Sequence, residues 1–319
     1  MKLRILLIAE EAAGVQAIRL LAGSSHHIVA VMTGGGHGMA SGLTIDRVAS
    51  LLGFPVWPVQ RVRETSFAET VRREEIDLLL NVHALCVLPG DLVAAPRIGS
   101  FNLHPGPLPG YAGLNAPSWA IYHGERSHGV TVHRMDAGID TGPIAYEAQL
   151  AIDDEDTGFT LSAKCVRAGI PLLHQLLQAA AEGAVPRRAQ AAQPRRYYGR
   201  EVPQQGRLFW TAPAAQVVNF VRACDYLPFA SPWGHPAASI GGRELLLLKA
   251  TRTGEPCTAP PGSVGEQMGG DVLVAAADEW VQVRRVRVGK LALPAAEVLQ
   301  PGDRFDLPAK SEEALSATR

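Results

Sequence analysis

The chain has 319 residues, of which 47% are apolar, and its formal net charge is -1. A chain of this length is usually too long to fold around one hydrophobic core, so we expect two domains. A net charge so close to zero excludes the strong overall positive field with which many nucleic-acid-binding proteins attract phosphates.

The cysteines and the apolar segments restrict the class of protein further. The cysteines are far apart and form no C-x-x-C pair, which argues against a zinc ribbon and a disulfide framework. We therefore expect reduced thiols in a cytoplasmic protein. The apolar run Leu3–Ala9 ends at two glutamates, which favours a buried strand over a signal peptide. No apolar stretch approaches the roughly 20 residues that span a bilayer, so we expect no membrane partner.

Short apolar runs alternate with helical patterns in the first half of the chain. The expected strands are Leu3–Ala9, His27–Met32, Pro55–Val59, Asp77–Val82 and Ile98–Leu103. The expected helices between them are Gly14–Leu21, Thr44–Leu52 with Thr44 as its cap, and Phe67–Glu74. Such alternation favours the α/β class, with a mainly parallel sheet covered on both faces.

The middle of the chain continues this pattern and then changes composition. We expect a helix at Ala116–His123, a strand pair at Gly129–Met135 and Ile144–Leu150, and a long helix at Leu161–Glu182 with a kink at Pro171. These elements complete a first domain over residues 1–182. Residues 183–205 are rich in Ala, Pro, Gln and Arg and are interpreted as a linker.

The last third of the chain indicates a second, smaller domain over residues 206–309. A helix is expected at Pro213–Cys224, with proline suited to its first turn. The short Val/Leu-rich runs after it predict a small β-barrel or sandwich; they are Glu244–Lys249, Asp271–Ala275, Trp280–Val286 and Lys290–Ala292. The polar tail over residues 310–319 is expected to be disordered.

The densest chemical pattern is S-F-N-L-H-P-G-P-L-P over residues 100–109. Asn102 and His104 are two residues apart at the end of an expected strand, so their side chains project from the same face. In open α/β sheets, ligands bind at the carboxyl ends of the strands. An amide donor beside an imidazole can stabilise a developing oxyanion and move a proton.

A second pattern, D-A-G-I-D-T-G-P, covers residues 136–143 and presents two carboxylates in a glycine-rich loop. A carboxylate near His104 would raise the imidazole pKa and could accept the proton that an attacking amine loses. Taken alone, each pattern also fits a simpler interpretation. A histidine can be buried in a turn, and this loop can be only a turn.

The order and spacing of three stretches, Phe101–Pro105, Gly129–Asp136 and Gly138–Gly142, resemble the 10-formyltetrahydrofolate-dependent formyltransferases. The nearest branch is the methionyl-tRNA formyltransferase-like one, and Phe209-Trp210 and Pro261–Val264 extend the resemblance over nearly the whole chain. The resemblance implies an N-formyltransferase with a Rossmann-like catalytic domain and a small C-terminal open β-barrel of the OB-like type. It also implies 10-formyltetrahydrofolate as co-substrate and no metal.

Residue roles follow from the resemblance position by position. Asn102 and a protonated His104 would stabilise the tetrahedral oxyanion, and Asp140 would orient His104 and take up the proton of the amine. The pterin would lie against Cys86, Val87 and Leu88. The loop that closes its other side would contribute Arg134, Met135, Asp136 and Gly138.

The chain departs from the methionyl-tRNA branch beside the catalytic histidine. Residues 106–119, where that branch usually has a basic loop, contain no Arg or Lys, and neither do residues 33–42. Because tRNA binding depends on neutralising phosphates, this absence counts against a tRNA acceptor. The stretch is more similar to formyltransferases of specialised metabolism, including the formylation domains of nonribosomal peptide synthetases. We therefore expect a small-molecule or carrier-protein-bound amine acceptor.

Tyr111, Asn115 and Trp119 are the candidates for shaping the acceptor pocket, and His37 could also reach the acceptor. The alternative for Trp119, a place in the core of its helix, is equally open. A nucleotide-linked amino sugar and methionyl-tRNA are alternative acceptors.

Three other functional classes of protein are alternatives to a formyltransferase. A nucleotide-binding oxidoreductase would need G-x-G-x-x-G after the first strand, which Ala9–Gly14 does not provide. A 10-formyltetrahydrofolate hydrolase would use the same three catalytic residues. A non-catalytic binding module would have no reason to keep all three. The sequence leaves the oligomeric state open.

Overall fold

The computed structural model describes residues 1–34, 44–192 and 194–307. The chain divides into two compact units. The first contains residues 1–116, 127–151 and 162–199, and the second contains residues 117–126, 152–161 and those from 200 onwards. Two short segments that we expected in the first domain therefore belong to the second unit. His37 and the tail from Lys310 lie outside the described residues.

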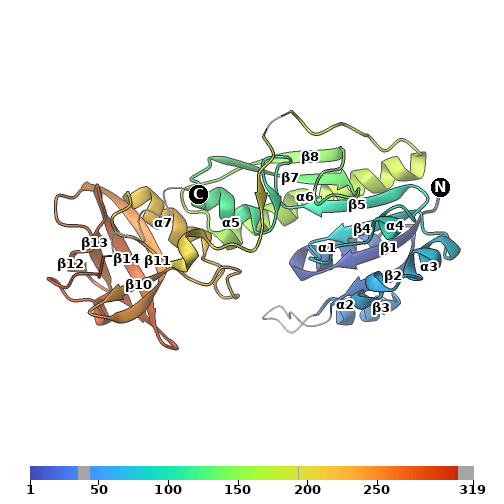
Figure 1. Cartoon of the computed structure of the whole chain (residues 1–319). Coiled ribbons are helices and arrows are strands. Elements are labelled where there is room, and N and C mark those ends of the chain that lie inside the picture. Colours follow the sequence, from blue (N-terminus) through green and yellow to red (C-terminus); the bar gives the residue numbers. More distant parts are fainter. Residues whose placement is uncertain (35–43, 193, 308–319) are drawn as a thin grey trace. The chain divides into compact units, whose positions relative to one another are not determined.

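A mixed sheet with seven strands forms the first unit, in the order β3-β2-β1-β4-β5-β7-β8 (Figure 1). Its strands are β1 (Arg4–Ala9), β2 (His27–Thr33), β3 (Val56–Pro58), β4 (Leu78–Val82), β5 (Gly99–His104), β7 (Ser127–Arg134) and β8 (Ile144–Ala151). The first five strands in this order pair in parallel, and β5, β7 and β8 pair antiparallel. The expected α/β class is confirmed.

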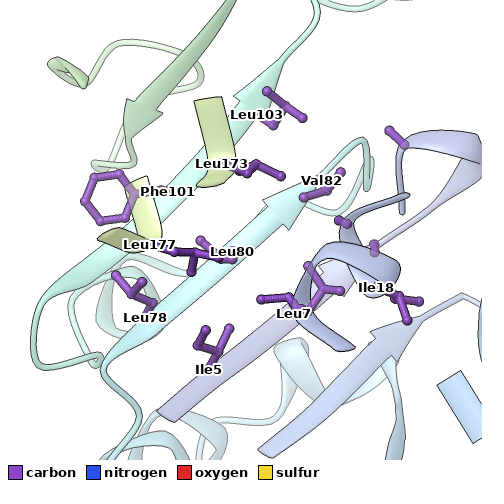
Figure 2. Close-up of a cluster of buried hydrophobic side chains, with 14 of the residues drawn as sticks. Ile5, Leu7, Ile18, Leu78, Leu80, Val82, Phe101, Leu103, Leu173 and Leu177 are labelled. Atoms are coloured by element: carbon purple, nitrogen blue, oxygen red, sulfur yellow. The ribbon is translucent and has the colours of Figure 1, made fainter. Parts of the chain in front are cut away.

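Helices cover both faces of this sheet. Because successive residues of a strand point to opposite faces, they pack into two different cores. Ile5 and Leu7 of β1 belong to a core that includes Leu173 and Leu177, as Figure 2 shows. Their neighbours Leu6 and Ile8 belong to a different core. The elements of this unit are α1 (Glu11–Ala22), α2 (Ile45–Leu51), η1 (Val59–Arg63), α3 (Phe67–Arg73) and α4 (Gly90–Val93), with most of α6 (Gly158–Glu182).

The second unit contains an antiparallel sheet in the order β10-β11-β14-β13-β12, with β15 paired to β14. Its strands are β10 (Ala237–Ile240), β11 (Arg243–Pro256), β12 (Val264–Met268), β13 (Asp271–Ala275), β14 (Glu279–Val288) and β15 (Leu291–Pro294). The helical elements are α5 (Ala116–Tyr122), η2 (Pro203–Gly206), α7 (Ala214–Ala223) and η3 (Ala295–Glu297). The antiparallel sheet of this region is as expected, although the sequence patterns missed β10 and β12.

Part of the segment that we interpreted as a linker pairs with other strands of the first unit. Its strand β9 (Tyr197–Tyr198) pairs in parallel with β6 (Ala112–Gly113). Arg188 forms an antiparallel bridge with Ile144 at the start of β8. The segment therefore contacts the loops after β5 and after β7, which local sequence patterns do not reveal.

No helix within the described ranges combines the length with the apolar composition that crossing a bilayer requires. The expected cytoplasmic location stays a prediction.

Candidate active site

The carboxyl end of β5 presents Asn102 and His104 on one face of the sheet, as their spacing predicts. Neighbouring strands fix this end of β5, because Asn102 is in register with Asn81 of β4 and with His133 of β7. His104 is only 3% exposed. Both side chains are therefore held by the core of the unit.

The ring of His104 lies between two oxygen atoms. Its Nε2 is 2.6 Å from the carbonyl oxygen of Tyr111, and its Nδ1 is 3.6 Å from Oδ2 of Asp140. Since a carbonyl oxygen can only accept a hydrogen bond, Nε2 carries a proton and donates a hydrogen bond to the Tyr111 carbonyl. In the neutral ring Nδ1 is then free of a proton and faces the carboxylate.

Burial lowers the pKa of His104 and outweighs the charge of Asp140 and the Tyr111 carbonyl, which raise it. The neutral ring is therefore favoured near pH 7. This differs from the protonated His104 that the family resemblance implies. A proton that reaches the ring must enter between Nδ1 and the Asp140 carboxylate, where the two charged groups stabilise each other.

The backbone around His104 leaves no room for a further side chain. A Cβ atom at Gly106 would lie 2.7 Å from the carbonyl oxygen of Tyr111 and 2.9 Å from Nε2 of His104. The carbonyl of Gly106 accepts the hydroxyl of Thr131 at 2.8 Å. The chain reversal after β5 thus depends on glycine, and it carries the Tyr111 carbonyl to the imidazole.

Asp140 completes the site from the loop after β7. Its Oδ1 is 3.2 Å from Nδ2 of Asn102, and its Oδ2 accepts the backbone N–H of Gly113 at 2.8 Å. The residue is 8% exposed. Burial raises the pKa of Asp140, but His104, His133 and the Gly113 N–H together hold it well below its usual range. The carboxylate is therefore ionised at neutral pH.

His133 is the site residue that the sequence reasoning did not single out. Its Nε2 lies 3.2 Å from Oδ1 of Asp140 and 3.2 Å from Nδ2 of Asn102, and its Nδ1 donates to the carbonyl of Arg134 at 3.0 Å. The Asn102 amide must turn its nitrogen toward the carboxylate, so its two hydrogens serve Asp140 and the His133 ring. The Asp140 carboxylate thus has an imidazole beside each oxygen.

The residues expected to hold the pterin follow β4. Val87 is 73% exposed and the nearby Leu85 is 78% exposed, whereas Leu88 is buried in the core. Burial raises the pKa of the half-buried Cys86 thiol, and the charge of Glu10 raises it further. A thiol with a raised pKa is a poor nucleophile, which agrees with a role for Cys86 as a pocket residue.

The second set of expected cofactor residues has internal partners. Arg134 Nη1 donates to the carbonyl of Ile98 at 2.8 Å, and Asp136 Oδ1 accepts the Gly138 N–H at 3.0 Å. Met135 packs partly buried against the core that contains Leu6 and Ile8. The Asp136 side chain therefore shapes the loop that carries Asp140, whereas the Arg134 side chain reaches the segment before β5.

The three candidate acceptor residues are placed differently. Tyr111 is buried and stacks on Tyr198 with ring centroids 5.5 Å apart. Asn115 adopts the left-handed conformation, with φ of 56°. Trp119 belongs to the second unit, where it is 7% exposed and packs edge-on against Trp233 at 4.7 Å. These contacts agree with the alternative that Trp119 is a core residue.

The described part of the chain contains no group of three or more His, Cys, Asp and Glu side chains that could hold a metal ion. The site itself offers amide, imidazole and carboxylate groups.

Comparison with known proteins identifies the family. Residues 6–177 match the Formyl transferase family, and residues 202–301 match the family Formyl transferase, C-terminal domain. The chain belongs to the formyl transferase family. The prediction of an N-formyltransferase of the 10-formyltetrahydrofolate-dependent family is thereby confirmed.

Relatives of this formyl transferase carry several names. It is 31% identical to a methionyl-tRNA formyltransferase of Bradyrhizobium sp. (strain ORS 278), over 96% of this chain and 100% of the relative. An N-formyltransferase from Helicobacter canadensis, solved with folinic acid and dTDP-3-aminofucose, has a TM-score of 0.68 and 17% identity over 89% and 99% of the two chains.

A further solved structure is HypX from Aquifex aeolicus in complex with tetrahydrofolic acid, with a TM-score of 0.65 and 20% identity. The match covers 94% of this chain and 47% of HypX, so the formyl transferase spans about half of that protein. At these identities the solved structures support the fold and leave the acceptor unassigned.

Proposed function

We propose that this formyl transferase moves the formyl group of 10-formyltetrahydrofolate to the amino group of a small or carrier-tethered amine. The observation that carries the acceptor assignment is the absence of Lys and Arg from residues 106–119, next to His104. Across residues 200–307 acidic side chains are as numerous as basic ones. Neither region offers the excess positive charge with which proteins neutralise nucleic-acid phosphates.

The proposed reaction begins with attack of a neutral amine on the formyl carbon. A carbon–nitrogen bond forms, and the electrons of the formyl C=O move to oxygen. The Asn102 amide is a side-chain donor at the end of β5, and its hydrogens are directed to Asp140 and His133. One of them must therefore turn to the oxyanion. Such donors typically contribute about 3 kcal/mol to transition-state stabilisation.

The proton of the amine goes to the pair formed by neutral His104 and ionised Asp140. A proton on Nδ1 converts the 3.6 Å contact with Oδ2 into a charge-assisted hydrogen bond. The bond from the formyl carbon to the folate nitrogen then breaks, and that nitrogen takes a proton back. Tetrahydrofolate and the N-formyl product leave, and the site regains its starting charge.

The loop after β4 supports the proposed folate site. Leu85 and Val87 expose apolar side chains next to buried Leu88. Covering such a surface with the flat face of the pterin ring removes apolar area from water and favours binding. The residues proposed to line the pterin site are Cys86, Val87, Leu88, Arg134, Met135, Asp136 and Gly138. Tyr111 and Asn115 are proposed for the acceptor side.

Methionyl-tRNA is the second candidate acceptor. The 31% identity to methionyl-tRNA formyltransferases over their whole length favours it, and it does not support our expectation that tRNA is a disfavoured acceptor. A nucleotide-linked amino sugar is a further alternative, since the solved sugar formyltransferases share the fold.

Tetrahydrofolate release from 10-formyltetrahydrofolate, followed by absorbance, tests these assignments. The acceptor panel contains free amino acids, carrier-tethered aminoacyl groups, nucleotide-linked amino sugars and methionyl-tRNA. We expect release with amino acids or carrier-tethered aminoacyl groups. Release only with methionyl-tRNA or an amino sugar would overturn the acceptor assignment, and release without any amine would identify a hydrolase.

A further inference from the structure

One segment of the first unit contacts both loops that build the active site; it comprises residues 188–192 and 194–198, which we call the strap. Its first contact is at Ile144, whose N–H and carbonyl pair with the backbone of Arg188 at 2.7 and 2.9 Å. Its last contact is β9, which pairs with β6 between the chain reversal at Gly106 and Asn115. Between these contacts, side chains of the strap reach the Asp140 loop.

Gln190 makes the most specific of these contacts. Its Nε2 donates to the carbonyl of Asp140 at 2.8 Å and to the carbonyl of Gly142 at 2.9 Å. Both partners can only accept, so the amide orientation is determined by its environment. Arg195 adds a third such bond, from Nη2 to the carbonyl of Ile139 at 2.9 Å. The strap thus holds three backbone carbonyls around the catalytic carboxylate.

Asp140 needs this support because of where it lies. It is in a loop outside the sheet ladder, and its φ of 54° is in the left-handed region that side chains other than glycine rarely adopt. Such a conformation persists where surrounding contacts stabilise it. Two backbone carbonyls bound by one amide are a contact of this kind.

The strap also holds the other partner of the carboxylate. Gly113, whose N–H donates to Asp140 Oδ2, lies in β6 against β9. The approach is so close that a Cβ atom at Gly113 would lie 2.1 Å from the carbonyl oxygen of Tyr198. The Leu114 N–H donates to that same carbonyl at 2.8 Å. One segment therefore positions the Asp140 backbone and the donor that its side chain uses.

We propose that Gln190 is a positioning residue for formyl transfer, which aligns the Asp140 carboxylate with His104 by binding the carbonyls of Asp140 and Gly142. This inference rests on the proposed catalytic role of Asp140. Gln190 acts on the chemical step and not on substrate binding, because its amide hydrogens are used within the protein. Misplacement of a catalytic group by about 1 Å can lower a rate 100-fold.

Three variants of Gln190 separate hydrogen bonding from packing. Gln190→Met keeps the length of the side chain and removes both donors. Gln190→Glu keeps the shape and turns acceptors toward the two carbonyls. Gln190→Lys keeps a donor group that can serve both of them. The matched control, Arg188→Ala, removes an exposed ion pair with Glu147 from the same strap and keeps its backbone bridge.

The measurement is kcat and KM for 10-formyltetrahydrofolate at saturating acceptor, with the thermal midpoint Tm of each variant. We expect kcat to fall between about 10-fold and 100-fold in Gln190→Met and Gln190→Glu. KM should change by less than about threefold, since Gln190 does not contribute to the binding of 10-formyltetrahydrofolate in the ground state. Gln190→Lys should recover at least half of the loss in logarithmic units, and Arg188→Ala should keep the wild-type kcat.

Two results would overturn the inference while the wild-type enzyme transfers formyl groups. One is a wild-type kcat in both Gln190→Met and Gln190→Glu, and the other is a loss that Gln190→Lys shares equally with Gln190→Met. If wild-type protein transfers no formyl group to any acceptor, the proposed function fails instead, and the two failures are thus distinguishable.

Discussion

The two sides of the active site are built in different ways. Asn102 and His104 extend from β5, which lies between β4 and β7 in the sheet. Asp140 extends from a loop, has a positive φ, and is held by Gln190, Gly113 and neighbouring side chains. Paired strands thus fix the backbone of two catalytic groups, whereas the backbone of the Asp140 loop depends on polar contacts from residues distant in sequence.

The largest expected effect tests the loop side. Asp140→Asn should lower kcat by about 1,000-fold, because it removes the charge that stabilises a protonated His104. Asparagine tolerates the left-handed conformation, so the backbone should keep its course. Steady-state kinetics measure the loss, with Glu147→Gln on exposed β8 as the control for a lost negative charge. A rate within tenfold of wild type would remove Asp140 from the mechanism.

The next effect tests the strand side. His104→Gln should lower kcat by about 100-fold, because the variant retains a donor for the Tyr111 carbonyl and has no base facing Asp140. The fold should survive, and a Tm within a few degrees of wild type would show that. Unchanged turnover would mean that the proton follows a route without this ring.

A smaller effect is expected where the two sides meet. His133→Phe removes the ring nitrogen that lies 3.2 Å from both Asp140 and Asn102. This nitrogen accepts a hydrogen bond from the Asn102 amide, and such a bond contributes about 1 kcal/mol, so kcat should fall about fivefold. His133→Gln should recover part of this loss because its amide oxygen can again accept a hydrogen bond from Asn102. Identical rates in wild type and both variants would make His133 a packing residue only.

A separate effect concerns stability and not rate. Burial lowers the pKa of His128 from 6.5 to about 4, against the opposing effect of the Pro105 carbonyl that its Nε2 contacts. The unfolded state therefore binds the proton first, and the neutral ring stabilises the fold fully above about pH 6.5. This contribution should fall as the pH decreases toward 4, by up to about 1.4 kcal/mol per pH unit.

His128→Gln, which has no titrating ring, provides the comparison for that effect. The difference in unfolding free energy between wild type and variant should shrink between pH 6.5 and pH 4, as measured by denaturant unfolding. A difference that stays constant over this range would show that His128 titrates alike in both states.

The same contrast explains what the sequence could predict. Asn102 and His104 were accessible because period-2 spacing in a strand and the strand-end rule are local properties. Asp140 required resemblance to a family, since nothing local connects it to His104. His133 appears only through its register with Asn102, and Gln190 is 50 residues from Asp140. The linker interpretation of residues 183–205 missed the strap because composition carries no information about long-range backbone contacts.

The central claim is most directly tested by formyl transfer itself, measured as tetrahydrofolate release from 10-formyltetrahydrofolate with and without acceptor. Wild-type protein should release tetrahydrofolate only when an amine is present, with one N-formyl product per tetrahydrofolate, and Asp140→Asn should abolish nearly all of this signal. Equal release with and without amine, or equal release by wild type and Asp140→Asn, would contradict the account.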